Sequence, residues 1–600
     1  MCGIAGWFAP ASGRHADELV AMAQTMAHRG PDDRGTFVDA ANGVALVHNR
    51  LSIIDLSSAG HQPMPNEDGT VILTFNGEIY NFGELRSELA ARGHVFTSRT
   101  DSEILVHGYE EWGAGLLDRI AGMFAFAIWD ARRRTLLLAR DQMGIKPLYY
   151  WFDAAGGFYF ASEIKAFLPL EGFRPEINSA ALRQYLELNF VYDRHETSLR
   201  GVFKLPAGCS MELSVDDYAA RRRPVPQQYY APPSVEPATG EPGEVERRAD
   251  RLFEVLERVV CEHMIADVPV GLLLSGGLDS SIVAALAARQ GRVLTISMGF
   301  ADSVVDERPF ARTVSDFIGS DHEEVLIRSE EVTSDLERSV WFVDDLFGDW
   351  GVISTMVLYR KCREAGVKVV LVGEGSDELF GGYSNFETCG GPAADNKSAW
   401  RRSLQMYRWY SGRRWGRELW RFHHTLRDLH HTAHEDAFSA VRLFETRHQL
   451  PHCYNMKVDK ASMAVGVEAR VPFLDVRVAA EGYRTPRELL LRDGTNKQLL
   501  RQMAARHELL PSSILNRSKF GGSIATTWMD HSASFRAFAR DVILDPGGMT
   551  KSLGLERAMN AYFLKNRRGY AFPHSIGIFS ILAWRLLLLN LWSRRYAVVR

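Results

Sequence analysis

Residues 271–281 read GLLLSGGLDSS and are the most informative stretch of the chain. The apolar run Val268–Leu274 predicts a parallel strand that is buried on both faces. The segment Ser275–Gly277 predicts a tight turn with bare backbone amides, because glycine has no Cβ to block close approach. From Asp279 onward, apolar residues at helical spacing predict a helix. A strand, an open turn and a helix N-terminus form an anion site, although the Walker pattern GxxxxGK[ST] is absent.

Further apolar segments indicate that this strand belongs to an open α/β sheet. Arg292–Gly299, Glu324–Ile327 and Val367–Val372 read as strands separated by helical segments. Such alternation predicts a mainly parallel sheet whose ligands lie at the carboxyl ends of its strands. Asp279 and Asp377 both follow strand ends, so we expect this carboxylate pair to bind Mg²⁺.

Cys2 is the main chemical feature of the N-terminal half. Removal of Met1 would leave Cys2 with a free α-amine, whose reference pKa of about 8 lets it take the thiol proton. A cysteine at this position alone is weak evidence. It is followed, however, by four further motifs: HRGPD (28–32), RLSII (50–54), NGEIYN (76–81) and SRTDSE (98–103).

With these motifs, the run from Met1 to Leu213 resembles a class II glutamine amidotransferase domain. Short alternating strands at Val71–Phe75, Phe124–Trp129 and Thr135–Ala139 agree with the α+β N-terminal-nucleophile hydrolase sandwich of that family, in which antiparallel sheets lie between helices. The resemblance implies that Cys2 forms a γ-glutamyl thioester and releases ammonia. Water then frees glutamate.

The chemistry of a glutamine substrate suggests a role for each residue type. Arg50 can grip the carboxylate, Asp101 can pair with the ammonium, and Glu78 can assist. The Asn76 side chain and the Gly77 N–H are suitable oxyanion donors. The remaining predicted glutamine-binding positions are Leu51, Ser52, Ile53 and Ile54.

The C-terminal half resembles the synthetase domain of glutamine-hydrolysing asparagine synthetases. SGGLDS matches the pyrophosphate loop of N-type ATP pyrophosphatases, and DKASMA (459–464) and VEARVPFLD (467–475) match further signatures. The resemblance implies ATP as a substrate, with Mg²⁺ on Asp279 and Asp377 bridging its phosphates. It assigns pyrophosphate contacts to Ser275, Gly276, Gly277 and Ser280, and adenine and ribose contacts to Leu273, Met298, Val372 and Gly373. It also assigns adenylate formation to Glu374 and charge stabilisation on the departing pyrophosphate to Lys519.

The domain organisation follows from composition. Ser214–Val245 is rich in proline, glycine and charge and is the best linker candidate. We therefore expect a glutaminase domain over 1–213, a linker over 214–245, and an ATP pyrophosphatase domain over 246–600, an α/β domain with a mainly parallel sheet and added helices. Because ammonia becomes protonated in water, the family implies an enclosed tunnel between the two domains.

Composition limits the classes of binding partner and the cellular compartment that we expect for this chain. The net charge of −4 over 600 residues gives no overall footprint for nucleic acid, and six scattered cysteines without a CxxC pattern favour a reducing cytoplasm. No signal peptide is apparent, and Ile576–Trp592 contains Arg585 and is too short to span a bilayer, so it predicts a buried helix. We expect small-molecule substrates, no nucleic acid and no membrane, and leave a homodimer open.

The resemblance is weakest in the segment that, in the family, helps to form the pocket for the acceptor acid. The family pattern of acidic–Pro–Phe–Ala–Asp–Pro–Ser is here replaced within DDLFGDWGVIS (344–354), with Trp350-Gly351 in place of small turn residues. Aspartate is the default acceptor, and another carboxylic acid, as in natural-product tailoring, is the alternative. A non-catalytic scaffold is a third hypothesis, against which the filled catalytic positions count. Cys2 counts against a β-lactam synthetase-like cyclase.

Overall fold

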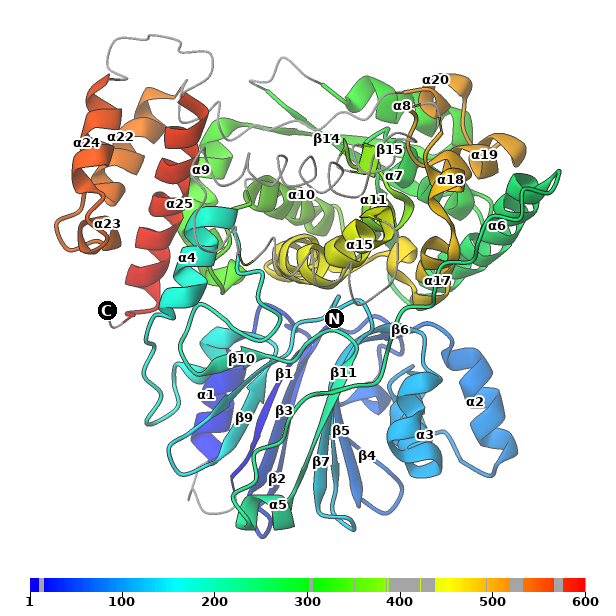
Figure 1. Ribbon diagram of the computed structural model, residues 1–600. Coiled ribbons are helices and arrows are strands. Elements are labelled where there is room, and N and C mark those ends of the chain that lie inside the picture. Colours follow the sequence, from blue (N-terminus) through cyan, green and yellow to red (C-terminus); the bar gives the residue numbers. More distant parts are fainter. Residues whose placement is uncertain are drawn as a thin grey trace.

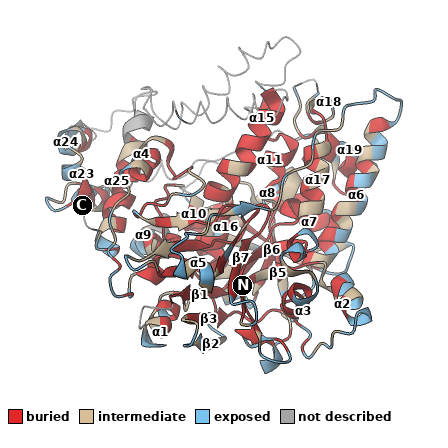
Figure 2. Ribbon diagram, turned by 60° about the horizontal axis from the view of Figure 1, so that its bottom comes forward, coloured by how far each residue is buried: buried red, intermediate tan, exposed pale blue. Residues whose placement is uncertain are grey.

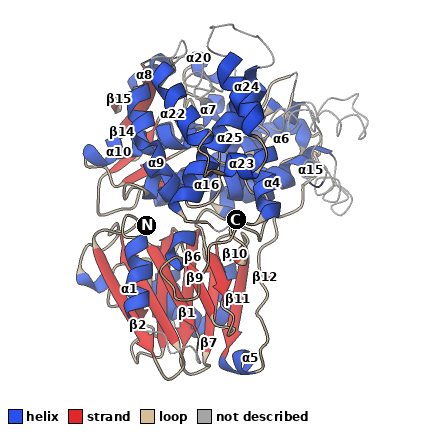
Figure 3. Ribbon diagram, turned by 90° about the vertical axis from the view of Figure 1, so that its left-hand side faces the viewer, coloured by secondary structure: helices blue, strands red, loops and turns tan. Residues whose placement is uncertain are grey.

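The computed structural model describes residues 1–9, 16–301, 306–349, 351–384, 386–387, 421, 437–492, 494–517, 532–565 and 576–598. Figure 1 shows two stacked parts, with the N-terminal half below and the C-terminal half above. Most strands lie in the first part and most helices in the second (Figure 3). The two halves of the sequence therefore build two architectures, as the motifs predict.

The N-terminal half contains two six-stranded sheets, and every pairing in them is antiparallel. The first sheet has the order β10-β8-β9-β1-β3-β2 and consists of β1 (Gly3–Phe8), β2 (Asp33–Asp39), β3 (Val44–Arg50), β8 (Tyr149–Phe152), β9 (Phe158–Ala161) and β10 (Val202–Lys204). The second has the order β12-β11-β7-β6-β5-β4 and consists of β4 (Met64–Pro65), β5 (Val71–Ile79), β6 (Gly122–Asp130), β7 (Thr135–Arg140), β11 (Cys209–Ser214) and β12 (Gln227–Gln228).

The two sheets pack face to face between helices because their strands are apolar on both sides. Along β1, Ile4 and Phe8 join the core shared with the second sheet, whereas Ala5 and Trp7 join the core on the opposite face. The outer faces are covered by α1 (Ala16–Thr25) on the first sheet, and by α2 (Phe82–Ala91) and α3 (Glu103–Trp112) on the second. The central strands β1, β3, β6, β7 and β9 are wholly buried, and Figure 2 shows much of this sandwich in red, whereas the edge strands β2 and β12 are largely exposed or half-buried. The predicted sandwich is confirmed.

The C-terminal half is built on a five-stranded sheet in which all pairings are parallel. Its order is β15-β14-β13-β16-β17, with β13 (Val270–Leu273), β14 (Leu294–Phe300), β15 (Asp321–Ile327), β16 (Val369–Leu371) and β17 (Glu468–Arg470). The first four strands confirm the sequence prediction, and β17 adds an unpredicted edge strand. Helices between the strands are α7 (Leu278–Ala288), α8 (Arg308–Ile318), α9 (Ser329–Val343), α10 (Gly351–Glu364) and α11 (Ser376–Phe380).

Further helices complete this half of the molecule. They include α15 (Ala437–Phe444), the π-type helix η4 (Glu445–Tyr454), α16 (Asn455–Met463), α17 (Val476–Arg484), α18 (Arg487–Leu490), α19 (Gln498–Arg506), α20 (Ser512–Leu515), α22 (Ala533–Ile543), α23 (Met549–Ser552), α24 (Glu556–Lys565) and α25 (Ile576–Arg595). In α25, the buried Trp584 and Trp592 donate to the carbonyls of Gly348 (3.0 Å) and Asp344 (3.1 Å). This confirms the predicted buried C-terminal helix. Among the described residues, no helix combines the length and apolarity that crossing a membrane requires.

The proline-rich segment between the halves carries short elements of its own. It contains α5 (Val215–Ala219) and β12, which pairs with β11 through Gln228 and Cys209. The next helix, α6 (Glu244–His263), packs against the parallel sheet domain through Leu252 and Leu256. The segment therefore follows the edge of the second antiparallel sheet before it enters the C-terminal half.

Candidate active sites

Cys2 immediately precedes β1 and is buried. Its backbone N–H donates to Asn76 Oδ1 (2.9 Å), and its carbonyl accepts from Arg29 Nε (3.0 Å). Burial raises the pKa of the Cys2 thiol, while the nearby N-terminal ammonium and the N–H of Leu51 favour the thiolate. The backbone of the predicted nucleophile is thus held at both of its polar groups.

Asn76 and Gly77 lie on β5 beside Cys2. Asn76 Oδ1 accepts from Cys2, but Asn76 Nδ2 is buried and has no hydrogen-bond partner among the described residues. Leaving a buried amide unpaired costs free energy, so such a donor is a natural place for a ligand oxygen. At Gly77 a Cβ would collide with the carbonyl of Met123 on β6. The two predicted oxyanion donors therefore lie next to the nucleophile, and the Asn76 amide has unused capacity.

Arg50 is the last residue of β3, and the loop that follows it holds its guanidinium. Arg50 Nη2 donates to the carbonyl of Asp55 (2.5 Å), and Gly60 packs so closely that a Cβ there would collide with the same nitrogen. The loop itself is tied to the C-terminal half, because the Ile53 carbonyl accepts from the N–H of Asp267 (2.9 Å). Tertiary contacts thus fix the predicted carboxylate-binding residue.

Glu78 and Asp101 form a buried carboxyl pair. Glu78 Oε1 lies 3.0 Å from Arg470 Nη2, and Asp101 Oδ2 accepts from the N–H of Ile79 (2.8 Å). Burial raises the pKa of Asp101 to about 6. Burial and the charge of Asp101 raise the pKa of Glu78 well above its usual range. With a pKa of about 6, Asp101 is ionised at neutral pH and can attract the substrate ammonium.

Two residues of β17 reach this pocket from the parallel sheet. Glu468 Oε2 lies 2.8 Å from the Met1 ammonium, and Glu468 Oε1 lies 2.6 Å from Arg470 Nε. Burial opposes ionisation of Glu468, but the Met1 ammonium and Arg470 outweigh it and lower its pKa to about 2. Because they stand two positions apart on a strand, both side chains leave the same face. The C-terminal half thus contributes a charged pair to the pocket of Cys2.

The predicted turn Ser275–Gly277 joins β13 to α7. Ser275 Oγ lies 3.0 Å from Ser280 Oγ and accepts from the N–H of Gly277 (3.3 Å). Gly276 has a φ of +69°, and a Cβ there would press on α8, so glycine is required. Gly277 caps α7 without a side-chain hydrogen bond. The first amides of the helix are therefore open to an anion.

The carboxylates of Asp279 and Asp377 both contact the ammonium group of Lys497. Lys497 Nζ lies 2.6 Å from Asp279 Oδ2 and 2.6 Å from Asp377 Oδ1. Ser376 Oγ donates to Asp279 Oδ1 (2.8 Å) and helps to orient that carboxylate. Two carboxylates that meet at a single positive charge are a donor set suited to Mg²⁺, so the residues fit the predicted metal.

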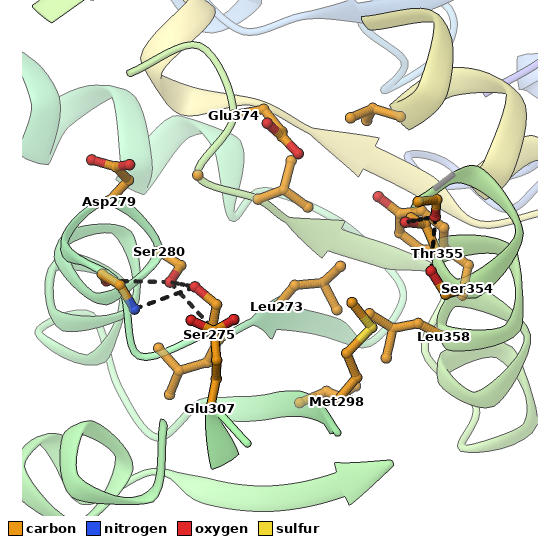
Figure 4. A pocket seen from close by; sticks show the side chains of 18 of the residues that line it. Leu273, Ser275, Asp279, Ser280, Met298, Glu307, Ser354, Thr355, Leu358 and Glu374 are labelled. Carbon is orange, nitrogen blue, oxygen red and sulfur yellow. Dashed lines mark hydrogen bonds between the residues drawn. The ribbon is translucent and has the colours of Figure 1, made fainter. Parts of the chain in front are cut away.

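A cavity of about 400 Å³ opens where β13, β14 and β16 end. In Figure 4, Ser275, Ser280 and Asp279 lie at one end and Leu273, Met298 and Leu358 at the other. The cavity is thus polar at the helix terminus, while the opposite side combines apolar side chains with the hydroxyl residues Ser354 and Thr355, which suits a nucleotide with its phosphates on the helix. Ten predicted residues line it: Leu273, Ser275, Gly277, Asp279, Ser280, Met298, Val372, Gly373, Glu374 and Asp377.

The positively charged side chain of Lys457 lines the cavity. Lys457 Nζ is 3.7 Å from Glu374 Oε1, and both residues line the cavity. Burial opposes the charge of Lys457, but Glu374 and Asp349 outweigh it and raise its pKa. Ser354 and Thr355 of α10 supply hydroxyls to the same cavity, and Figure 4 shows them across from the serine turn.

A buried ion pair connects the two sites. Arg29, which holds the Cys2 carbonyl, also donates to both carboxylate oxygens of Asp459 (2.9 and 3.0 Å). Asp459 lies on α16 directly after Lys457 and Val458, which line the cavity. Less than one turn of helix therefore lies between Asp459, which pairs with Arg29, and the residues that line the cavity.

The predicted residues fall into two groups in space. The RLSII positions Leu51 and Ile53 are buried near Cys2, and the Ser52 N–H donates to Asp32 (2.8 Å). Ile54 is partly buried and packs on the adjoining core. Gly276 lies in the turn rather than in the cavity lining, and Lys519 and Trp350 lie outside the described residues.

Sequence reasoning missed four charged residues, Lys457, Glu468, Arg470 and Lys497. For the β17 pair there was a signal, because a glutamate and an arginine alternate with valine and alanine inside VEARV (467–471). Charged residues on one face of such a strand indicate a buried polar contact. The two lysines carry no comparable pattern.

Known protein families match each half of the chain. A family model described as a glutamine amidotransferase domain matches residues 1–230, and one described as asparagine synthase matches residues 251–594. A Mycobacterium tuberculosis protein named a putative glutamine-hydrolysing asparagine synthetase is 36% identical over 585 residues, covering 87% of each chain. Glutamine-hydrolysing asparagine synthetase 1 of Bacillus subtilis is 31% identical over 570 residues, covering 87% of this chain and 86% of its own.

A plant enzyme and a solved structure are more distantly similar to the chain. The Zea mays glutamine-hydrolysing asparagine synthetase is 30% identical over 541 residues, covering 86% of this chain and 76% of its own. A solved structure titled as the allosteric regulatory enzyme of purine biosynthesis covers 55% of this chain and 80% of its own, at 13% identity and a TM-score of 0.30, too distant to bear on the fold. On its family models and its relatives, the chain belongs to the asparagine synthase family and is an enzyme of the glutamine-hydrolysing asparagine synthetase type.

Proposed function

We propose that the enzyme hydrolyses glutamine at Cys2 and passes the ammonia internally to an acyl-adenylate made from aspartate and ATP. The products are asparagine, AMP, pyrophosphate and glutamate. The domain division proposed with it is 1–213 for the glutaminase, 214–245 for the linker and 246–600 for the synthetase.

In the glutaminase half, the Cys2 thiolate attacks the side-chain amide of glutamine. Arg50 binds the substrate carboxylate and Asp101 its ammonium. The oxyanion accepts hydrogen bonds from Asn76 Nδ2 and the Gly77 N–H, and the unpartnered Asn76 amide supports this role. After Met1 is removed, the Cys2 amine takes the thiol proton, and Glu468 stabilises the resulting ammonium.

In the synthetase half, the open end of α7 and the Ser275 and Ser280 hydroxyls bind the ATP phosphates. Asp279 and Asp377 would hold Mg²⁺, which neutralises phosphate charge when bound. Glu374 handles the proton of adenylate formation and amide synthesis, with Lys457 beside it. Lys519 is assigned to the departing pyrophosphate by resemblance alone.

The observation that carries the proposal is the pair of direct links between the two sites. Arg29 contacts both Cys2 and Asp459, and Arg470 contacts Glu78 while its strand pairs with β16, whose end opens into the cavity. The buried path along α16 supports an enclosed route for ammonia. Such a route matters because water would protonate ammonia and remove its nucleophilicity.

A second candidate has the same chemistry with a different carboxylic acid. The departure at 344–354 favours it, since Gly351 now lines the cavity beside Ser354 and Thr355. A screen of carboxylic acids, followed by pyrophosphate release with glutamine and ATP, separates the two. Aspartate with asparagine as product supports the first candidate, and a different acid that outperforms it supports the second.

A non-catalytic scaffold predicts a different result. Wild type and Cys2→Ala would then release glutamate from glutamine equally slowly. We expect a wild type that is active and a Cys2→Ala variant that is not.

A further inference from the structure

A cluster of two histidines and a glutamate lies on the outer side of the glutaminase domain, away from both sites. His94 follows α2, and His107 and Glu110 lie one turn apart on α3. One donor atom from each lies within 4.8 Å of the others. His107 is only 2% exposed, Glu110 lies at the surface, and His94 is between these extremes.

A second carboxylate, that of Glu103, lies behind the His107 ring. Its Nδ1 lies 3.3 Å from Glu110 Oε2, while its Nε2 lies 3.6 Å from Glu103 Oε1. Glu103 is itself fixed, because it accepts from the backbone N–H groups of Thr97 (2.7 Å) and Ser98 (2.8 Å). Metal-binding histidines commonly place one ring nitrogen on the ion and the other N–H on a carboxylate.

The other two members show the same orientation. Asn66 Nδ2 donates to Glu110 Oε1 (2.7 Å), which leaves Glu110 Oε2 toward the histidines. His94 Nδ1 lies 4.0 Å from a Glu110 carboxylate oxygen, Oε2, and His94 Nε2 lies 3.5 Å from Glu111 Oε2. Each imidazole therefore turns Nδ1 inward and Nε2 toward a second carboxylate. This repeated arrangement matches the way metal-binding histidines are held, with one ring nitrogen toward the ion and the other toward a carboxylate.

We propose that His94, His107 and Glu110 bind a divalent transition-metal ion, with Zn²⁺ as the best fit. Two imidazole nitrogens and one carboxylate oxygen form a typical zinc donor set. Zinc–ligand bonds of about 2.0–2.1 Å place the donors of a tetrahedral site about 3.3 Å apart. The 3.3 Å separation between His107 Nδ1 and Glu110 Oε2 equals that value, and His94 Nδ1, at 4.0 Å from the same oxygen, would move inward on binding.

Glu67 lies close enough to the cluster to serve as a fourth ligand. Glu67 Oε1 lies 3.7 Å from His107 Nδ1, and its side chain is half exposed, so it or a water completes the tetrahedron. The cluster joins three segments: the loop before β5, the end of α2, and α3. Because α3 begins two residues after Asp101, the metal would brace the segment that presents Asp101 to glutamine. Its role is thus structural.

Metal binding is tested on the full chain, purified without a polyhistidine tag and stripped with a chelator. Zn²⁺ is titrated by competition with a chromophoric chelator, and Co²⁺ by its visible absorption, which is intense in tetrahedral sites. We expect one tight equivalent per chain in wild type and in His195→Ala, a control in which an exposed histidine of the same domain is lost. Glu110→Gln and the double variant His94→Ala/His107→Ala should lose more than ~100-fold in affinity.

Circular dichroism and thermal unfolding of the same preparations show whether each variant is folded. Glutamine has nearly the same shape as glutamate, so the metal affinity of Glu110→Gln decides the question if the double variant unfolds. Zn²⁺ should raise the unfolding temperature of wild type and not of Glu110→Gln. A wild type that binds neither metal, or variants that retain the full wild-type affinity, would overturn the proposal and leave the two histidines paired with carboxylates only.

Discussion

Arg470, on the edge strand of the parallel sheet, lies 3.0 Å from Glu78 in the glutaminase pocket. The same guanidinium donates to the carbonyls of His263 (2.8 Å) and Ile265 (2.7 Å), so it is anchored within the C-terminal half. Glu468 on the same strand faces the N-terminal ammonium. The glutaminase pocket is therefore completed by the synthetase domain, and neither half forms it alone.

The Glu468 carboxylate should matter for glutamine hydrolysis and little for adenylation. In Glu468→Gln we expect kcat/KM for glutaminase to fall by ~10- to 100-fold, because a hydrogen bond to a charged group contributes about 1.5–3 kcal/mol. Pyrophosphate release with ammonium salts should remain near the wild-type rate. The exposed Glu488→Gln is the matched control. Equal losses in both assays would instead indicate general destabilisation.

The pKa of Asp101 sets an acid limit on glutamine binding. Burial raises that pKa to about 6, and only the ionised carboxylate attracts the substrate ammonium. As pH falls through about 6, Asp101 takes up a proton, so KM for glutamine should rise by ~10-fold per pH unit. Glutamate release measured between about pH 5 and 8 tests this. A KM that stays constant across that range would contradict it.

Gly60 should control the position of Arg50. In Gly60→Ala the new methyl group would displace the Arg50 guanidinium, which is the end of a flexible side chain, so the fold should survive. We expect KM for glutamine to rise by ~10-fold or more, with ammonium-dependent synthesis unchanged. Gly83→Ala on α2 has no atom within 4 Å of the added carbon and is the control. An unchanged KM would mean that Arg50 does not bind the substrate carboxylate.

Asp377→Asn should separate the two half-reactions. Loss of one carboxylate from the pair that meets at Lys497 should slow pyrophosphate release by ~100-fold or more, because the phosphate-bound cation is held less well. Glutaminase activity should persist, so glutamine is hydrolysed without synthesis. The exposed Asp541→Asn should behave as wild type. Wild-type pyrophosphate release in Asp377→Asn would refute the assignment.

Sequence patterns predicted the strands and loops because local signals decide them. The run before Ser275 is apolar enough to need cover on both faces, and β13 indeed lies inside a parallel sheet. Motif order also pointed to ten of the residues that line the cavity. The turn Ser275–Gly277 places part of this set locally, whereas the loop that holds Arg50 depends on a contact with Asp267 of the other half.

Contacts between distant segments could not be predicted in the same way. Lys497 reaches Asp279 and Asp377 only after α19 packs against the sheet domain, and no periodicity records that approach. The Arg29–Asp459 pair likewise depends on how the two domains meet. Burial of such charges is stable only with a partner at hydrogen-bond distance, so the partners emerge with the tertiary structure.

Nitrogen released at Cys2 should reach the adenylate in the cavity of Asp279 and Asp377 without entering bulk water. The direct test supplies glutamine labelled with ¹⁵N at its amide, together with excess unlabelled ammonium, and measures the label in the amide product by mass spectrometry. Aspartate, or the acid that the acceptor screen selects, serves as the acceptor. We predict that the product keeps nearly all of the glutamine label. A label diluted to the fraction present in the bulk ammonium would contradict the internal passage.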